Sequence, residues 1–119
     1  KVERVLAFLQ RWKSPVANYT IADKIVEHSD ANGADYRVVV AIMGIESGFC
    51  NAHFSYNCFG YLNGAKYGSF EQAFDDLVPK VARQYAAVYG WDFESLAKAY
   101  GMLNWEYHSA NMRVYANSI

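Results

Sequence analysis

Hydrophobic residues recur at helical spacing along most of this chain of 119 residues. Near the N-terminus the apolar positions lie three or four residues apart until Ser14 and Pro15 interrupt them, which predicts an amphipathic first helix. A second helix is expected from about Thr20 to the Asn32-Gly33 pair, because such a pair commonly ends a helix. The chain therefore begins with two helices, each with one apolar face.

The run from Tyr36 to Ile45 is apolar on nearly every side, and Asp35 can cap its first turn. Val38 to Val40 alone could also form a buried strand, since β-branched side chains favour strands. The run contains no turn signal and is longer than a usual strand, so it predicts a buried central helix that includes Glu46.

Residues 49–69 lack a helical period and predict a loop or a short hairpin. Five asparagine or glycine residues in this segment favour turns: Asn51, Asn57, Gly60, Asn63 and Gly64. Long loops in small domains often carry function, and this one begins beside Glu46. Five aromatic residues could line a cleft there or seal the core beneath the loop: Phe54, Tyr56, Phe59, Tyr61 and Tyr67.

Ser69 and Gln72 form a capping-box pattern before another helical period, in which Pro79 predicts a kink or a break. Two further helices are expected before the C-terminus. Their signals are Gly90, Asp92 and Gly101 around Phe93–Tyr100, and Asn104 as the cap of a last helix with Trp105, His108, Met112 and Tyr115 on one face. The expected fold is mainly α: one domain over residues 1–119, with helices around a central helix and a small loop or hairpin lobe that walls a groove.

Composition narrows the function classes. A formal net charge of −1 and a pI near 6.3 argue against a nucleic-acid partner, which requires a basic surface. The apolar run from Val38 to Ile45 is much shorter than the roughly 20 residues of a membrane-spanning helix, so we expect no membrane span. The start at Lys1 suggests a processed or excised domain. We expect a monomer without cofactor or metal.

Glu46 is the only formally charged residue between Arg37 and Lys66. Ser47 and Gly48 follow it as a helix end, so the carboxyl is expected in the last helical turn. Apolar surroundings and the negative end of the helix dipole would both raise its pKa and keep it protonated as a general acid. The alternative is an ordinary helix-end glutamate that reaches water.

Cys50 and Cys58 flank the first part of the loop, and their spacing favours an intrachain disulfide. Zinc binding with His53 is the alternative, but a fourth ligand at a usual spacing is missing. A disulfide implies an oxidising, extracytoplasmic compartment. His28 and His108 are expected to be ordinary histidines, the first half-exposed and the second with its hydrogen bonds satisfied at the rim of the core.

Glu46-Ser47-Gly48, followed by Asn57-Cys58-Phe59-Gly60-Tyr61, resembles the lysozyme-like superfamily, specifically lytic transglycosylases and goose-type lysozymes. Weaker similarity continues through Tyr67–Ala73 to Ala97–Tyr100. The resemblance implies a glycan cleft for peptidoglycan strands, with Glu46 as the catalytic acid. The substrate-binding residues it implies are Ser47, Asn57, Phe59, Gly60, Tyr61 and Tyr100, although Tyr100 could also be a core tyrosine.

Glycosidases usually use two carboxylates, and no second acid follows Glu46 closely. The lytic transglycosylase pattern needs one: Glu46 would protonate the oxygen between N-acetylmuramic acid and N-acetylglucosamine and then deprotonate the muramic C6 hydroxyl. Two alternatives stay open. A hydrolytic muramidase or endo-N-acetylglucosaminidase would use Glu71 as its second acid, and a non-catalytic glycan-binding or assembly domain would need no raised pKa at Glu46.

Overall fold

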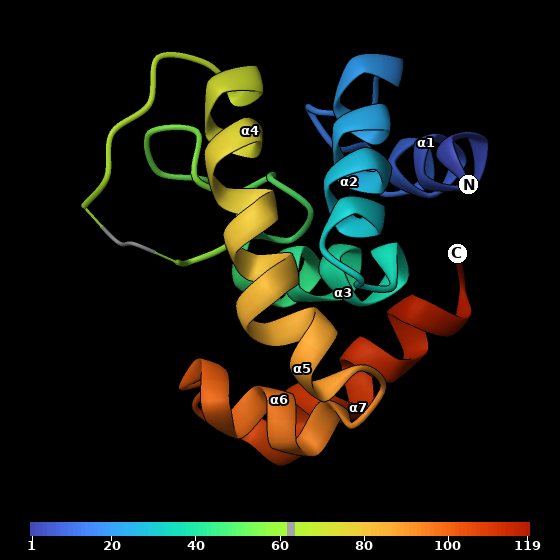
Figure 1. The fold of residues 1–119 in the computed structure, drawn as a ribbon, viewed down its shortest axis with the longest axis vertical. Helices are drawn as coiled ribbons and strands as arrows, with labels where there is room; N and C mark the ends of the chain where they lie inside the picture. Colours follow the sequence, from blue (N-terminus) through green and yellow to red (C-terminus); the bar gives the residue numbers. More distant parts are fainter. Residues whose placement is uncertain (62–63) are drawn as a thin grey trace.

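The computed structural model describes residues 1–61 and 64–119, so the predicted loop position Asn63 lies outside the described residues. The chain is mainly helical, as the hydrophobic periodicity predicted, and it measures 31 × 31 × 26 Å (Figure 1). The helices are α1 (Val2–Arg11), α2 (Tyr19–Ala31), α3 (Tyr36–Ser47), α4 (Phe70–Val81), the π-helical turn η1 (Ala82–Ala86), α5 (Ala87–Tyr89), α6 (Phe93–Tyr100) and α7 (Trp105–Asn117).

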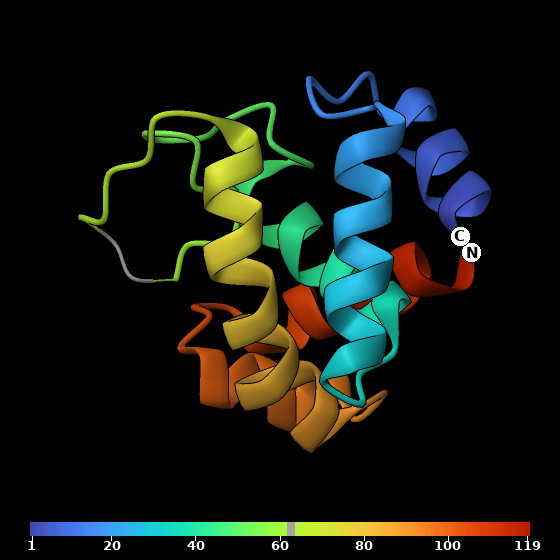
Figure 2. The ribbon, with the colours of Figure 1, turned by 45° about the horizontal axis from the view of Figure 1, so that its top comes forward.

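Helix α3 is the central element. Every residue from Val38 to Met43 is fully buried, and the helix packs against α2 on one side and α7 on another (Figures 1 and 2). Asp35 caps it by accepting a hydrogen bond from the Arg37 amide at 2.9 Å. Gly48 ends it with a left-handed backbone (φ 56°), a conformation that costs glycine nothing. The apolar run is therefore a helix, and the strand alternative for Val38–Val40 is wrong.

An aromatic cluster joins α1 and α7 at Phe49, which follows the C-terminal end of α3. The Phe49 ring lies 5.1 Å from the Phe8 ring and 5.1 Å from the Tyr115 ring. Gly44 makes this packing possible, because a Cβ atom there would lie 2.5 Å from the Phe49 ring. The N- and C-termini lie close together, and Arg11 hydrogen-bonds the Ser118 carbonyl (Figure 2).

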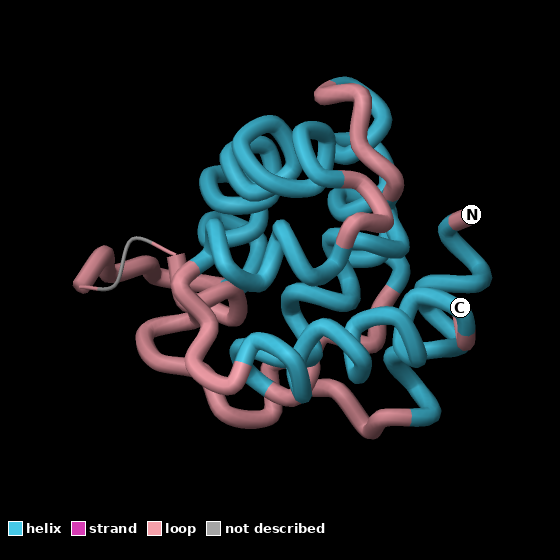
Figure 3. The backbone as a smooth tube through the Cα atoms, turned by 90° about the horizontal axis from the view of Figure 1, so that it is seen from below, coloured by secondary structure: helices cyan, strands magenta, loops and turns pink. Residues whose placement is uncertain are grey.

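The described residues between α3 and α4, 48–61 and 64–69, lie to one side of the helices (Figures 1 and 3). Its described residues form no helix or strand, and one isolated bridge pairs Phe54 with Asn57. Ser69 then caps α4 through the Gln72 amide, while the Gln72 side chain accepts from the Gly68 amide. This is the predicted capping box, with its second hydrogen bond displaced by one residue.

Two predictions concern helix ends. Of the kink or break predicted at Pro79, the break is wrong: α4 continues to Val81 and passes directly into the π-helical turn η1, an irregularity of the kind found at helix kinks. Leu77, Val78 and Val81 are buried, and this packing outweighs the one hydrogen bond that proline cannot donate. Asn104 precedes α7 but makes no cap, because its left-handed backbone (φ 54°) differs from the extended conformation of a capping residue.

Candidate functional site

Glu46 lies in the last turn of α3, as predicted, and its side chain is half-buried. Burial raises the pKa of its carboxyl above the ordinary value. Among the described residues no hydrogen bond or ion pair reaches this carboxyl. An acid that is buried, unpaired and accessible from a pocket is suited to hold a proton and to donate it.

Gly60 packs directly onto the Glu46 carboxyl. A Cβ atom at position 60 would lie 2.6 Å from one carboxylate oxygen, and the backbone there has a positive φ of 62°. The positive φ favours glycine, and any side chain at this position would displace the Glu46 carboxyl. The loop therefore covers the acid through bare backbone, and this close cover contributes to the burial that raises its pKa.

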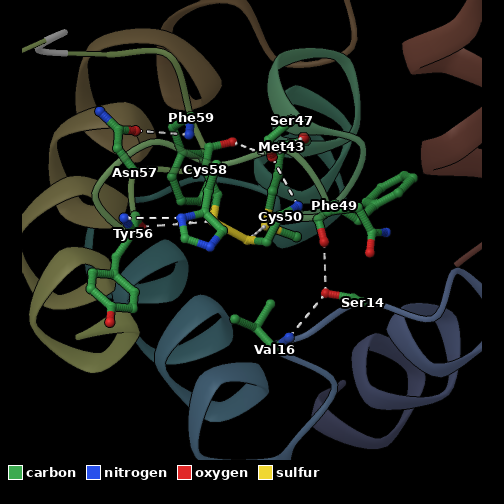
Figure 4. The surroundings of a disulfide bond; sticks show 12 residues. Ser14, Val16, Met43, Ser47, Phe49, Cys50, Tyr56, Asn57, Cys58 and Phe59 are labelled. Carbon is green, nitrogen blue, oxygen red and sulfur yellow. Dashed lines mark hydrogen bonds between the residues drawn. A yellow bond between two sulfur atoms is a disulfide. The ribbon is translucent and has the colours of Figure 1, made fainter.

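A disulfide joins Cys50 to Cys58, as predicted, and folds this part of the loop back onto α3 (Figure 4). Ser47 fixes both ends of the bridged segment: its hydroxyl donates to the Cys58 carbonyl (2.7 Å) and accepts from the Cys50 amide (2.9 Å). The hydroxyl of Ser14 also donates to the Phe49 carbonyl at 2.7 Å. Because both sulfur atoms are bonded to each other, zinc ligation by these cysteines is wrong.

Asn57 holds the next turn of the loop. Its side-chain oxygen accepts from the Phe59 amide (2.9 Å), and its side-chain nitrogen donates to the Tyr61 carbonyl (2.7 Å). These bonds fix the backbone that carries Gly60 to Glu46. Asn57 thus lies beside the acid and orders the loop there.

Two pockets meet at Glu46. The loop-side pocket, about 140 Å³, is lined by Glu46, Ala52, Phe54, Asn57, Gly60, Gly64 and Ala65. The helix-side pocket, about 260 Å³, is lined by Ile45, Glu46, Gly101, Met102, Leu103 and His108. Within the described parts of the chain, Glu46 is the one carboxylate that lines either pocket. Glu46 is therefore a lining residue that the two pockets share.

Tyr100 ends α6 close to the acid. Its hydroxyl donates a hydrogen bond to the Phe59 carbonyl, and its ring meets the Tyr85 ring edge-on at 4.6 Å. Burial, and next the negative charge of Glu46, raise the pKa of the Tyr100 hydroxyl. The residue is thus near Glu46, but its hydroxyl hydrogen bonds to the loop backbone.

The other predicted site residues divide between pocket and core. Ser47 and Phe59 are buried, and the Phe59 ring packs on Phe74. Tyr61 is half-buried, and its hydroxyl donates to the side chain of Gln84 on η1. The structure therefore brings Glu46, Asn57 and Gly60 together at a pocket and places Ser47 and Phe59 behind it.

Three of the remaining aromatic residues of the loop also differ in exposure. Phe54 is 70% exposed and lines the loop-side pocket. Tyr56 packs edge-on against Phe70, and the Tyr67 hydroxyl donates to Asp76 at 2.7 Å. Of these three, Phe54 is the one that lines a described pocket.

Glu71, the alternative second acid, is exposed in the first turn of α4 and lines neither pocket. His28 is half-exposed, as expected, but it also pairs with Asp75 on α4 at 2.9 Å, a contact between helices that the sequence did not indicate. Neither residue contacts the pockets at Glu46.

Sequence reasoning missed the helix-side pocket. Met102 and Leu103 belong to the turn between α6 and α7, and His108 lies in the first turns of α7. The expectation that His108 has its hydrogen bonds satisfied is wrong, because its Nδ1 atom is buried and has no partner among the described residues. The sequence does show a histidine on the packed face of the last helix. That position is compatible with a structural histidine as well as with a pocket residue.

The arrangement offers one protonatable acid between two pockets, held by a disulfide-linked loop. In the part of the chain that the structure describes, no helix has the length and apolar character needed to cross a membrane. The chain was compared with family models, with curated proteins and with solved structures, and no match was found in any of the three.

Proposed function

We propose that this chain cleaves the glycan strands of peptidoglycan as a lytic transglycosylase, with Glu46 as its single catalytic acid. The observation that carries the proposal is the position of Glu46: a half-buried residue whose carboxyl has a raised pKa and which lines two pockets. A glycan strand with one sugar in each pocket would present the bond between those sugars to the acid. The sequence resemblance at Glu46-Ser47-Gly48 and Asn57–Tyr61 supplies the substrate class.

In this mechanism Glu46 donates its proton to the oxygen between N-acetylmuramic acid and N-acetylglucosamine, and the bond from that oxygen to the muramic anomeric carbon breaks. The acetamido group of the muramic residue stabilises the resulting cation. Glu46, now a carboxylate, removes the proton of the muramic C6 hydroxyl, whose oxygen then bonds to the anomeric carbon. The product is a 1,6-anhydro sugar, and no water is consumed.

Asn57 and Tyr100 would orient the acetamido group. Asn57 donates one side-chain hydrogen to Tyr61 and retains a second N–H for a ligand. The Tyr100 hydroxyl donates its hydrogen to the Phe59 carbonyl, and its oxygen can still accept a hydrogen bond from an acetamido N–H. The disulfide supports an extracytoplasmic location, where such bonds persist and where peptidoglycan lies.

Replacement of the acid by its amide tests the proposal. Glu46→Gln keeps the shape of the side chain and removes the proton, so turnover should fall by about 10²- to 10⁴-fold. Glu71→Gln is the matched control, because Glu71 is exposed and lines neither pocket. Purified peptidoglycan would be digested with each protein, and the products analysed by mass spectrometry.

The product masses separate the alternatives. A lytic reaction gives anhydro products, whereas a hydrolase adds one water to each product. Hydrolysis products that disappear in Glu71→Gln would replace the lytic mechanism with the two-acid mechanism. Binding of glycan strands without cleavage by the wild-type protein would identify a non-catalytic binding domain.

A further inference from the structure

The helix-side pocket contains a polar group that the proposed chemistry does not use. Its lining has two polar side chains, Glu46 and His108, and the remaining side chains are apolar or absent. Leu103 lies at this pocket with 85% of its side chain exposed. A pocket that combines apolar side chains with a few polar groups is the usual composition of a ligand site.

The two ring nitrogens of His108 differ in their surroundings. Nδ1 is buried without a partner, whereas Nε2 is not among the buried atoms and forms no hydrogen bond with the described residues. The neutral tautomer with its hydrogen on Nε2 avoids burying an N–H donor that nothing accepts from. The accessible edge of the ring is then a hydrogen-bond donor.

We propose that His108 is a specificity residue of the helix-side pocket, where Nε2–H donates to an oxygen acceptor on the sugar next to the cleaved bond. The apolar side chains of Ile45, Met102 and Leu103 would contact the C–H face of that sugar. The inference rests on the proposed function. It adds to the site a substrate-binding histidine in the helix-side pocket, where the proposed mechanism assigns no residue other than Glu46. The acceptor is either an acetamido carbonyl or the carboxylate of a muramic residue.

Histidine ring signals in NMR spectra test this contact directly, since the chain has three histidines. The Glu46→Gln protein would be titrated with a chitooligosaccharide, which carries acetamido groups alone, and separately with a purified glycan strand that contains muramic acid. We expect the His108 ring signals to shift on saturation, and the signals of His28 to stay unchanged because His28 lines neither pocket. A shift with both ligands identifies the acetamido carbonyl as acceptor, and a shift with the glycan strand alone identifies the carboxylate.

Kinetics of His108→Phe give a second measurement, because phenylalanine keeps a ring and loses the donor. The loss of one hydrogen bond to the substrate should raise KM by about tenfold with little change in kcat. His28→Phe is the matched control, a half-exposed histidine on α2 away from the site. If His108→Phe does not fold, the titration still decides the question.

The outcomes separate this inference from the proposed function. Shifts at Asn57 and Gly60 without a shift at His108 would show glycan binding on the loop side alone, and would overturn the role of His108 while the proposed function stands. An unchanged KM in folded His108→Phe would overturn it equally. If neither glycan shifts any signal, the proposed function fails and the inference falls with it.

Discussion

Tyr100 illustrates, at the scale of single residues, how one side chain can belong to both the scaffold and the site. Its hydroxyl donates to the Phe59 carbonyl, and the next residue, Gly60, packs on the Glu46 carboxyl. The hydrogen bond therefore links α6 to the part of the loop that covers the acid. A change at Tyr100 is expected to reach Glu46 through this backbone.

Tyr100→Phe should lower both stability and turnover. The lost hydrogen bond should cost about 0.5–1.5 kcal/mol of unfolding free energy. Turnover should fall by about tenfold, because the backbone at Gly60 loses a restraint beside the acid. Melting temperature and specific activity per folded molecule, measured on the same samples, check both effects.

Either effect without the other would change the interpretation of Tyr100. Lower turnover at unchanged stability would mean that the hydroxyl serves the substrate instead of Phe59. Lower stability at full activity would make Tyr100 a structural residue and remove it from the site. Tyr107→Phe is a suitable control, since Tyr107 is a tyrosine with 68% of its side chain exposed.

Local sequence could reveal Glu46 but not every residue around it. A single charge in an apolar run is visible in the sequence, and the Ser47-Gly48 end of the run places it in the last turn. Ser47 shows that being next to the acid in sequence does not place a residue in the pocket. Successive helical residues point about 100° apart, so the neighbour of an accessible acid can face inward. His108 lines the same pocket as Glu46 because α7 packs on α3, and no local pattern encodes that packing.

At the scale of elements, the loop after α3 has buried ends at Phe49–Cys50 and Cys58–Phe59, and covalent and polar bonds hold the backbone between and beside them. The Cys50–Cys58 disulfide, the Ser47 hydroxyl and the Asn57 side chain each fix a different part of its backbone (Figure 4). Residues 51–54 between the cysteines are exposed. Without the disulfide, this segment has little apolar contact to hold it in place.

The double variant Cys50→Ala/Cys58→Ala tests the role of the bridge. Closing a loop of this size is worth about 2–3 kcal/mol in the chain-entropy model, so the variant should unfold at a lower denaturant concentration. Activity per folded molecule should fall as well, because Asn57 and Gly60 lie at the end of the same segment. Denaturant unfolding and peptidoglycan digestion provide the two measurements.

Thiol labelling of the denatured, unreduced wild-type protein supplies the control for this variant. No cysteine should react before reduction, and both should react after it. Reactive thiols in protein purified from an oxidising compartment would contradict the bridge. Full activity of the double variant would show that the loop keeps its shape without it.

The helices themselves were largely readable from the sequence, and the errors have physical reasons. The boundaries of α1, α2, α3 and α6 follow local caps and stop signals, such as Gly101 after Tyr100 with its left-handed φ of 79°. Pro79 does not break α4, because burial of the helix on its neighbours outweighs a local penalty, but the helix turns π-helical three residues later. The course of the loop depends on distant partners such as Ser14, which no periodicity reveals.

At the scale of the whole molecule, Asp75 and Glu46 have pKa shifts of opposite sign and therefore opposite effects on the pH dependence of stability. Hydrogen bonds from His28 and then Lys24 hold the pKa of Asp75 below its usual range. Such an acid contributes stability above its unfolded pKa, and the contribution is lost as the pH falls through the folded pKa. Asp75 therefore ties α2 to α4 less firmly in acid.

Glu46 acts in the opposite direction, because burial raises the pKa of its carboxyl. The protonated Glu46 carboxyl contributes its full stability at a pH below the pKa it has in the unfolded chain. This contribution is lost as the pH rises through the pKa it has in the folded protein, since the folded protein then has to ionise a buried group. Each unit of pKa difference corresponds to about 1.4 kcal/mol. The burial of Glu46 thus costs stability at neutral pH, and such a cost is the trade-off expected if Glu46 is the catalytic acid.

Comparison of wild type with Glu46→Gln isolates this cost, because glutamine does not titrate and the contributions of Asp75 and the other aspartates cancel between the two proteins. The unfolding free energy of Glu46→Gln relative to wild type should rise with pH above the unfolded pKa of glutamate, about 4.3, and level off once Glu46 is ionised in the folded protein. Denaturant titrations of both proteins from about pH 4 to about pH 8 measure the difference directly. A relative stability that falls with pH would mean that the fold stabilises the charged form of Glu46. The carboxyl would then be ionised at neutral pH, and its role as the general acid would be wrong whatever the cleavage assays show.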